Sequence, residues 1–352
     1  MSDDLFSRSC SEGVFLNEDV LSPEFLPDVL PGREKHLSAL ALALKPFAEG
    51  RRGSGLLLFG PPGTGKTSSA KHVLSQMRDF SKKAEFAFIN CWQHYTRQGV
   101  LAEAARQLGI VIPRRGLATD EVRQDLFSSL SKSGARVVLA LDEADQLFAK
   151  NEDGVFYDLS RAPVPVLVLC LTNVPAAFED LDSRVKSSLS LEPLEFSKYS
   201  PLEIKAILRE RAKRAFRPNA CPEDAVALCA AYAAKNGGDA RVALDVLWKA
   251  GKACERRGGK ALEETDVRSA FAEQDDLNAS VKKRMEGIGP SEQQILAALS
   301  EPKYSGDLQA ETGIAERSLR RYLAQLEAKR LVVVEEEQNV GGAGKRRKVS
   351  RV

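Results

Sequence analysis

Short apolar runs alternate with segments of helical periodicity through the first half of the chain. A buried parallel strand reads as a nearly continuous apolar run, because helices cover both of its faces. Such runs predict four strands, at 55–59, 85–90, 136–142 and 164–172. Apolar residues three or four apart predict helices around them, at 32–44, 68–79, 100–108 and 120–132, the first of them ended by Pro46. Strands that alternate with helices predict an α/β fold with a parallel sheet covered on both faces.

The pattern changes after about residue 193. Helical stretches alone occupy 201–276, broken by prolines and glycine pairs, which predicts a small all-helical domain. The segment 291–352 predicts three helices followed by two strands around the glycine-rich turn 341–344. We therefore expect an N-terminal arm at 1–29, an α/β domain at 30–196, a helical domain at 197–280, a linker at 281–290 and a small C-terminal domain at 291–352.

A glycine-rich loop follows the first predicted strand and precedes a helix. Its residues match the phosphate-binding pattern GxxxxGK[ST] and are Gly60, Pro61, Pro62, Gly63, Thr64, Gly65, Lys66 and Thr67. The glycines let backbone N–H groups approach phosphates, and the helix N-terminus favours an anion. The pattern predicts that Lys66 reaches the β- and γ-phosphates of a nucleotide and that Thr67 ligates Mg²⁺.

Polar residues end two of the later strands. Asp142 and Glu143 follow the third strand, and Asn173 follows the fourth. In nucleotide hydrolases with such a loop, the Asp holds Mg²⁺ and the adjacent Glu orients the attacking water. Asn173 can hydrogen-bond the γ-phosphate or its water, although an Asn just before Pro175 also suits a turn.

Two arginines are candidates for contact with the nucleotide. Arg184 lies at the start of a short segment after the fourth strand, and Arg241 starts a helix of the helical domain. A guanidinium can neutralise the charge of a phosphoryl transition state. Arg184 would act on the site of a neighbouring subunit, and either residue could instead be an ordinary surface charge.

Charge and composition limit the remaining possibilities. Lys plus Arg number 51 and Asp plus Glu number 49, so the net charge of +2 excludes a globally basic coat for nucleic acid. No apolar run approaches the roughly 18 residues of a membrane span. The six cysteines form no CxxC pair and there are three histidines, so we expect neither a zinc site nor a disulfide framework. The polar, acidic N-terminus is unlike a targeting peptide, and we expect a cytoplasmic protein.

Basic residues cluster in the C-terminal domain. A helix-turn-helix places its second helix in the major groove of DNA, and the third predicted helix carries Arg317, Ser318, Arg320 and Arg321. The last predicted strand carries Lys345, Arg346, Arg347 and Lys348, which could contact phosphates or the minor groove. The alternatives are a solvated charged tail or a domain used for protein contacts.

Several motifs in this order resemble those of the archaeal DNA replication initiators related to the eukaryotic origin recognition complex, which are AAA+ ATPases. The matching segments are LPDVLPGRE (26–34), GPPGTGKT (60–67), INCWQH (89–94), LDEADQL (141–147), LDSRVKSSL (181–189) and GGDARVAL (237–244), followed by a winged-helix segment. The resemblance implies an AAA+ P-loop domain, a helical lid and a C-terminal winged helix.

The same resemblance implies roles and partners. It makes Asn173 sensor 1, Arg241 sensor 2 and Arg184 a finger-type arginine, and it places a family-specific insertion at 92–110. It implies ATP or ADP with Mg²⁺ as cofactors and slow, regulatory hydrolysis. Its partners would be double-stranded origin DNA, an MCM-type replicative helicase and other subunits in a homo- or hetero-oligomer on DNA. A protein-remodelling or clamp-loading ATPase and an ATP-regulated transcription regulator remain alternatives.

Overall fold

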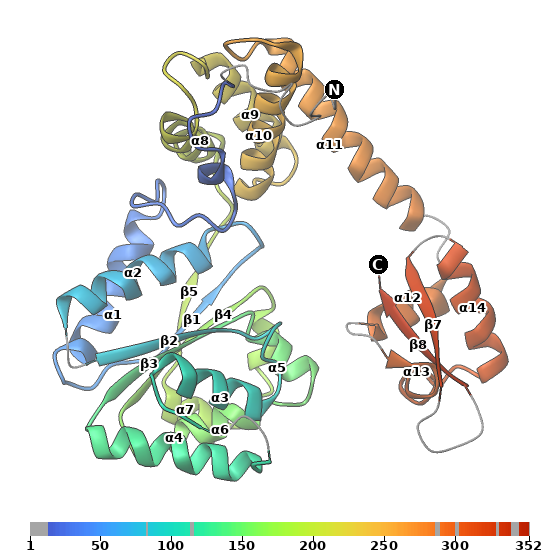
Figure 1. Ribbon diagram of the computed structural model, residues 1–352. Helices are drawn as coiled ribbons and strands as arrows, with labels where there is room; N and C mark the ends of the chain where they lie inside the picture. Colours follow the sequence, from blue (N-terminus) through green and yellow to red (C-terminus); the bar gives the residue numbers. More distant parts are fainter. Residues whose placement is uncertain are drawn as a thin grey trace, which may run out of the picture. The chain divides into compact units, whose positions relative to one another are not determined.

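The structure is a computed structural model that describes residues 13–81, 84–112, 116–285, 289–299, 303–328, 331–338 and 345–351. Two compact units make up the chain, residues 1–270 and residues 271–352. The boundary between them falls within helix α11 (Glu264–Met285). The first unit holds an α/β domain and a helical lid, and the second holds the small C-terminal domain (Figure 1).

A parallel sheet forms the centre of the α/β domain, with the strand order β2-β3-β4-β1-β5. Its strands are β1 (Leu56–Phe59), β2 (Ala84–Asn90), β3 (Arg136–Asp142), β4 (Val166–Thr172) and β5 (Glu192–Glu195). The sequence predicts the first four to within two residues. It misses β5, because the sequence Glu-Pro-Leu-Glu is mostly exposed and contains no apolar run.

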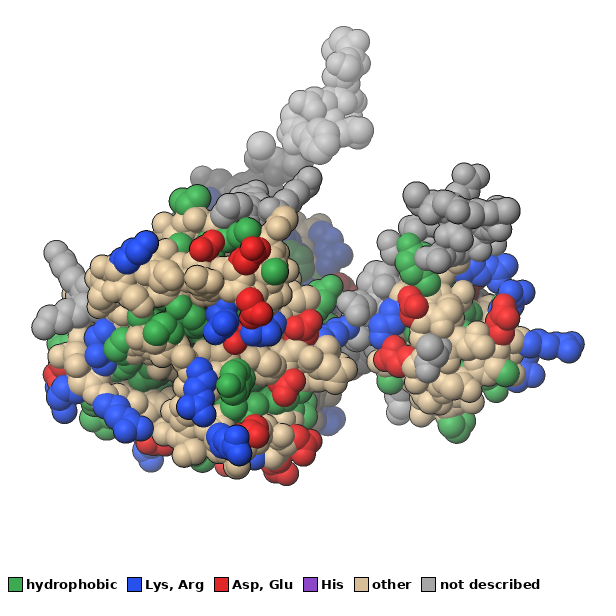
Figure 2. Space-filling model, turned by 90° about the horizontal axis from the view of Figure 1, so that it is seen from below, with side chains coloured by type: hydrophobic (Ala, Val, Ile, Leu, Met, Phe, Trp, Pro, Cys, Tyr) green, Lys and Arg blue, Asp and Glu red, His purple; other side chains and the backbone are tan. Residues whose placement is uncertain are grey.

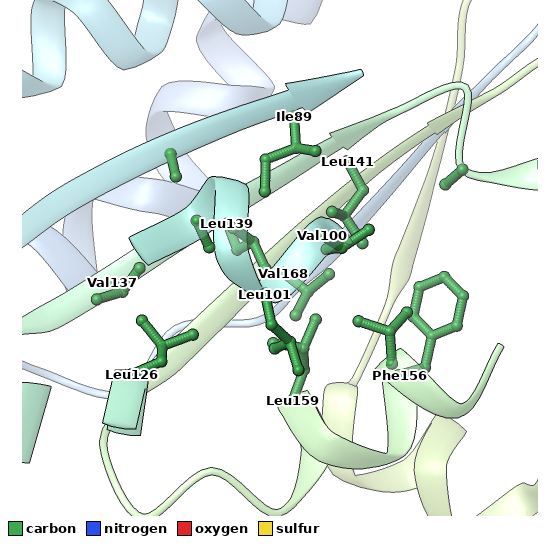
Figure 3. Close-up of a cluster of buried hydrophobic side chains, with 14 of the residues drawn as sticks. Ile89, Val100, Leu101, Leu126, Val137, Leu139, Leu141, Phe156, Leu159 and Val168 are labelled. Carbon is green, nitrogen blue, oxygen red and sulfur yellow. The ribbon is translucent and has the colours of Figure 1, made fainter. Parts of the chain in front are cut away.

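Helices cover both faces of the sheet, which confirms the predicted α/β class (Figure 1). One face is covered by α1 (Glu34–Ala48) and α2 (Lys66–Phe80), and the other by α3 (Arg97–Gln107), α4 (Thr119–Ser133), α6 (Gly154–Ser160) and α7 (Ser183–Leu189). Figure 3 shows the larger cluster, in which Val168 of the sheet lies beside Leu101 and Leu159 of the helices. Burying each such side chain contributes about 1.5–3 kcal/mol.

Helix α3 is fixed to the domain at both ends. At its C-terminal end, Gln107 pairs its amide with the backbone of Phe88 on the edge strand β2, at 2.8 and 2.9 Å. This pairing covers part of an edge that would otherwise be open to another chain. At its N-terminal end, Arg97 donates to both carboxylate oxygens of Asp158 on α6, at 2.5 and 2.8 Å. The segment that contains α3 is therefore held against β2 and against α6.

Helices alone follow the sheet, as the sequence predicts; three of them and the first part of a fourth form the lid. They are α8 (Pro201–Ala215), α9 (Glu223–Lys235), α10 (Ala240–Arg257) and α11. Capping residues fix where two of these helices begin or end. Ser200 and Glu203 form a capping box around Pro201 at the start of α8, and Gly258 ends α10 in the left-handed conformation.

The N-terminal arm is packed against the lid. Residues 18–21 form the 3-10 helix η2 (Glu18–Leu21), and Val14, Val20 and Leu21 are buried. Arg217 N donates to Val14 O at 3.0 Å, and the rings of Phe15 and Phe216 lie 4.7 Å apart. These apolar positions have neither helical nor strand spacing, so periodicity alone predicts only an extended arm. Residues 1–12 of the predicted arm lie outside the described part.

The chain is helical at two places where the sequence suggests a helix end or a linker, and the expected end at Pro46 is wrong. Helix α1 continues through Pro46 to Ala48, because burial of Phe47 and Ala48 stabilises its last turn. Pro46 has no N–H for the carbonyl of Leu42, which is 72% exposed and so close to water. The predicted linker 281–290 is helical at both ends, since α11 runs to Met285 and Pro290 starts the next helix; residues 286–288 lie outside the described part.

After the end of α11, the described residues of the C-terminal unit form three helices and a small antiparallel sheet, the elements of a winged helix (Figure 1). Its elements are α12 (Pro290–Ala298), β6 (Lys303–Tyr304), α13 (Ser305–Thr312), α14 (Glu316–Ala328), β7 (Val332–Gln338) and β8 (Lys345–Arg351). Leu319, Leu323 and Leu326 of α14 are buried against Ile295 and Val349, which confirms the predicted core face. The helices of the described residues include no segment with the length and apolar character needed to cross a membrane.

The ion pair between Arg97 and Asp158 provides a test of how α3 is held. Asp158 is 2% exposed and Arg97 is about one-third exposed. We expect Asp158→Ala to lower the free energy of unfolding by about 2 kcal/mol. The variant removes the buried carboxylate of the pair, and the cost stays moderate because solvent screens the charge left on Arg97. Asp120→Ala removes an exposed partner of the same arginine and should cost under about 1 kcal/mol. Urea denaturation measures the free energy of unfolding of both variants. Equal losses in the two variants would contradict the conclusion that the ion pair with Asp158 holds α3.

Candidate functional site

A cavity of about 600 Å³ lies where the carboxyl ends of β1, β3 and β4 face lid helices α8 and α10. In open parallel sheets, ligands bind at this edge. The predicted residues that line the cavity are Pro62, Gly63, Thr64, Gly65, Lys66, Thr67, Asp142, Glu143, Asn173 and Arg241. The sheet therefore brings together residues that are far apart in the sequence.

The loop after β1 is built for close backbone approach. Gly60 has φ 144° and Gly63 has φ 70°, both in the region that favours glycine. A Cβ atom would lie 2.1 Å from the carbonyl oxygen of Phe196 at Gly60, and 1.7 Å from a carboxylate oxygen of Asp239 at Gly63. Only glycine fits there, because the connection to the lid and the start of α10 both pack on this loop.

Lys66 joins the loop to the end of β4. Its ammonium donates to the carbonyl oxygens of Gly60 and Pro61 at 2.7 and 2.8 Å, and to Asn173 Oδ1 at 2.8 Å. Burial lowers the pKa of Lys66 to about 8, and Asp142 opposes that shift. A buried cation at the N-terminus of a helix is placed to bind an anion that enters the cavity.

Thr67 and Asp142 are adjacent, as a shared metal ion requires. Thr67 Oγ1 donates to Asp142 Oδ2 at 3.0 Å. Asp142 is 7% exposed, and burial raises the pKa of its carboxyl group. Mg²⁺ usually binds one or two carboxylates together with substrate phosphates, so this hydroxyl and carboxylate fit that ion.

Glu143 has an unusual backbone at the rim of the cavity. Its φ of 54° lies in the left-handed region, and its N–H donates to Asp142 Oδ1 at 3.1 Å. Burial raises the pKa of its carboxyl group, and the neighbouring charges of Asp142 and Asp145 add to the effect. Such backbone strain in a non-glycine residue gathers at functional sites.

The two candidate arginines differ in position. Arg241 lines the cavity and is half exposed, and its backbone N–H donates to Asp239 Oδ1 at 2.8 Å. Its lid helix reaches the loop directly, because Ala240 N donates to Gly63 O at 3.4 Å. Arg184 is exposed on α7 and does not line the cavity of its own chain.

Sequence patterns assign no role to Arg33, although it lies in a segment that carries the family resemblance. Its side chain is 1% exposed and donates to Thr64 O at 2.8 Å and to Ser197 O at 2.7 Å. Its guanidinium lies 3.8 Å from the centre of the Tyr199 ring. Arg33 thereby joins the phosphate-binding loop to the segment that leads from β5 into the lid.

Arg211 on α8 is a second buried arginine that sequence patterns miss. It donates to Val20 O at 2.7 Å and to Phe25 O at 3.0 Å, so it holds the arm across the lid. Burial lowers its pKa to about 10. The arm residues 23–27 and 29–31 then line the cavity on their way to α1.

The predicted DNA-contacting residues of α14 lie on its outer side. Arg317, Arg320 and Arg321 are exposed, and Ser318 is half-buried. Arg320 pairs with Glu316 one turn earlier. Arg321 lies 4.9 Å from the centre of the Tyr322 ring. Within the described residues, no acidic side chain forms an ion pair with Arg317 or Arg321.

Strands β7 and β8 are called the wing here. The basic residues predicted to contact DNA from the last strand lie on β8, which pairs antiparallel with β7. Arg347 is exposed. The side chains of Lys345, Arg346 and Lys348, and residues 339–344 as a whole, lie outside what the structure describes. The backbone register is defined, and it places acidic residues of β7 opposite three of these four basic positions.

Two family models match the first unit. A model described as an AAA domain matches residues 50–174, and one described as a Cdc6 AAA+ ATPase-type lid domain matches residues 205–272. The two matches fall on the sheet with its phosphate-binding loop and on the helices that face it.

Named relatives cover most of the chain. The ORC1-type DNA replication protein 1 of Sulfolobus acidocaldarius is 35% identical over 77% of this chain and 70% of its own length. The ORC1-type DNA replication protein of Pyrococcus abyssi is 36% identical over 88% of this chain and 77% of its own. Among solved structures, the Aeropyrum pernix ORC1 protein in complex with DNA is 30% identical, with a TM-score of 0.72 over 96% of this chain and 94% of that one. The chain therefore belongs to the family of ORC1-type DNA replication proteins, whose nucleotide-binding domain is an AAA+ ATPase domain.

Proposed function

We propose that this chain is an ATP-dependent initiator that binds replication-origin DNA and helps to load an MCM-type replicative helicase. The main support is one cavity that gathers the phosphate loop, Asp142, Asn173 and Arg241, in a chain that also carries a winged helix. A relative of similar length, 30% identical, is named as a complex with DNA. The protein would act on the chromosome, in the nucleoid of the cytoplasm.

In this proposal the loop residues 60–67 bind the phosphates of ATP or ADP. Lys66 leaves the carbonyl groups of Gly60 and Pro61 and pairs with the β- and γ-phosphates, which compensate its charge better than neutral oxygens do. Thr67 and Asp142 would hold Mg²⁺, which neutralises charge on the phosphates when bound. Glu143 accepts a hydrogen bond from the attacking water, and Asn173 orients the γ-phosphate.

Hydrolysis in this proposal is a slow switch. Arg241 sits on the lid, so its contact with the γ-phosphate would depend on whether that phosphate is present. Arg184 is exposed and does not line the cavity of its own chain, and it would complete the site of a neighbouring subunit on DNA. The bound nucleotide would then set the lid position and, through it, the binding of DNA and helicase.

Glu143→Gln tests the catalytic assignment. The amide keeps the size of the side chain but is a poor proton acceptor, so hydrolysis should fall on the order of a hundredfold while ATP affinity stays within about twofold. Glu210→Gln is the matched control, because Glu210 lines the same cavity from the lid. Phosphate release and calorimetric titration with ATP give the two readouts. Unchanged turnover in Glu143→Gln would remove this residue from its role.

Selection of the host's genomic fragments tests origin binding. With ATP and Mg²⁺ at about 0.15 M salt, where weak surface charge is screened, the wild-type protein should enrich one or a few loci. Arg317→Ala with Arg321→Ala should reduce that enrichment at least tenfold, because each lost base contact costs about 1–3 kcal/mol. Arg320→Ala should do less, since Glu316 already compensates Arg320.

The other outcomes separate the alternatives. Enrichment at many promoters would favour a transcription regulator over an initiator. No enrichment by the wild-type protein above the double variant would contradict origin binding, and a protein-remodelling ATPase would then fit the nucleotide site better. Co-purification with an MCM-type helicase on the selected locus would separate an initiator from a regulator.

A further inference from the structure

The two strands of the wing carry opposite charges in register. Three consecutive acidic residues lie on β7 and a run of basic residues lies on β8. The antiparallel ladder pairs Glu335 with Lys348, Glu336 with Arg347 and Glu337 with Arg346. Every basic residue of the run 346–348 is therefore directly opposite an acidic residue on the neighbouring strand.

Lys345 breaks this pattern. Its partner in the register is the neutral residue Gln338. Lys345 is also the first residue of β8 after the glycine-rich segment, and thus the basic position of the strand closest to the tip of the wing. Of the four basic residues expected to contact DNA from the wing, it alone has no acidic residue at the opposite position.

Helix α14 likewise carries both a basic residue with an acidic partner and basic residues without one. Arg320 is paired with Glu316, whereas Arg317 and Arg321 have no acidic partner among the described residues. Figure 2 shows acidic and basic side chains mixed over the visible face of the C-terminal unit. Opposite charges therefore face each other along the strand register and in the ion pair between Arg320 and Glu316.

Local compensation changes how a protein binds DNA. Affinity for DNA of any sequence comes mainly from the release of counterions as cations neutralise phosphates. Opposite charges at directly opposed positions of an antiparallel pair attract each other, and an acidic residue there also repels phosphate. A compensated basic residue therefore adds less to non-specific affinity than an uncompensated one does.

We propose that Glu335, Glu336 and Glu337 determine DNA specificity by compensating the basic strand of the wing, so that binding depends on Lys345, Arg317 and Arg321. This inference rests on the proposed function, since it takes DNA as the ligand of the winged helix. The acidic strand lowers the affinity for unrelated duplex, where phosphate contacts supply nearly all the binding. It lowers the affinity for the cognate site less, because base contacts contribute there as well.

The test uses the whole 352-residue chain with Glu335→Gln and Glu337→Gln together. These two positions lie opposite Lys348 and Arg346 in the register, and their exchange raises the net charge by two. The control is Asp276→Asn with Glu327→Gln, which changes the charge equally at exposed helical positions of the same unit. Fluorescence anisotropy at several salt concentrations measures the affinity for a 30-base-pair duplex of mixed sequence and for the locus selected above.

We expect the wing variant to bind the mixed-sequence duplex at least tenfold more tightly at low salt. The slope of log affinity against log salt should become steeper by about two, since each newly effective cation adds about 0.9. The ratio of cognate to mixed-sequence affinity should fall. The control variant should differ from wild type by less than about threefold. Equal gains in both variants, or an unchanged slope in the wing variant, would overturn the proposal.

A second comparison tests the pairing itself. Lys345→Gln should reduce the salt slope by about one in the wild-type background. In the wild-type background, Arg346→Gln should leave the salt slope nearly unchanged. In the Glu337→Gln background, it should reduce the salt slope by about one. Equal effects of Arg346→Gln in both backgrounds would contradict compensation by the opposite residue. Binding to the mixed-sequence duplex tests charge compensation in the wing, and binding to the selected locus tests origin recognition. Failure of the compensation proposal can therefore be distinguished from failure of the proposed function.

Discussion

A single buried guanidinium holds together the two halves of the nucleotide site. A loop that binds phosphate must turn its N–H groups toward the anion, so its carbonyl groups face the protein and need donors there. Arg33 supplies a donor to Thr64 O and, from the same planar group, another to Ser197 O in the connection to the lid. One side chain thus fixes the orientation of the loop and the start of the lid together.

The rest of the site follows from this arrangement. The lid connection packs so closely on the loop that only glycine fits at position 60, and α10 does the same at position 63. The N-terminal arm, held by Arg211, then forms another wall of the cavity. The carboxyl ends of β3 and β4 bring Asp142 and Asn173 to Thr67 and Lys66. A phosphate bound here would therefore be in reach of both the sheet and the lid.

The sequence predicts the site residues best where a polar motif directly follows a strand that the apolar pattern also predicts. The phosphate loop, Asp142 and Asn173 can be predicted to meet because parallel strands end at one edge of a sheet, and the structure places them there. Arg33 and Arg211 cannot be found in this way, since their partners are backbone carbonyl groups up to 191 residues away. The opposition of the acidic run and the basic run is also visible only in the structure, because it depends on the register in which β7 pairs with β8.

The most direct measurement is the affinity of Arg33→Met and Arg33→Lys for ATP with Mg²⁺, by calorimetric titration. Arg52→Met, at an exposed arginine before β1, serves as the control. If Arg33 holds the loop for phosphate binding, both variants should bind ATP at least about tenfold more weakly while remaining folded, because an ammonium group cannot reproduce the two-sided donation of a guanidinium. Affinities within twofold of wild type in folded Arg33 variants would contradict this account.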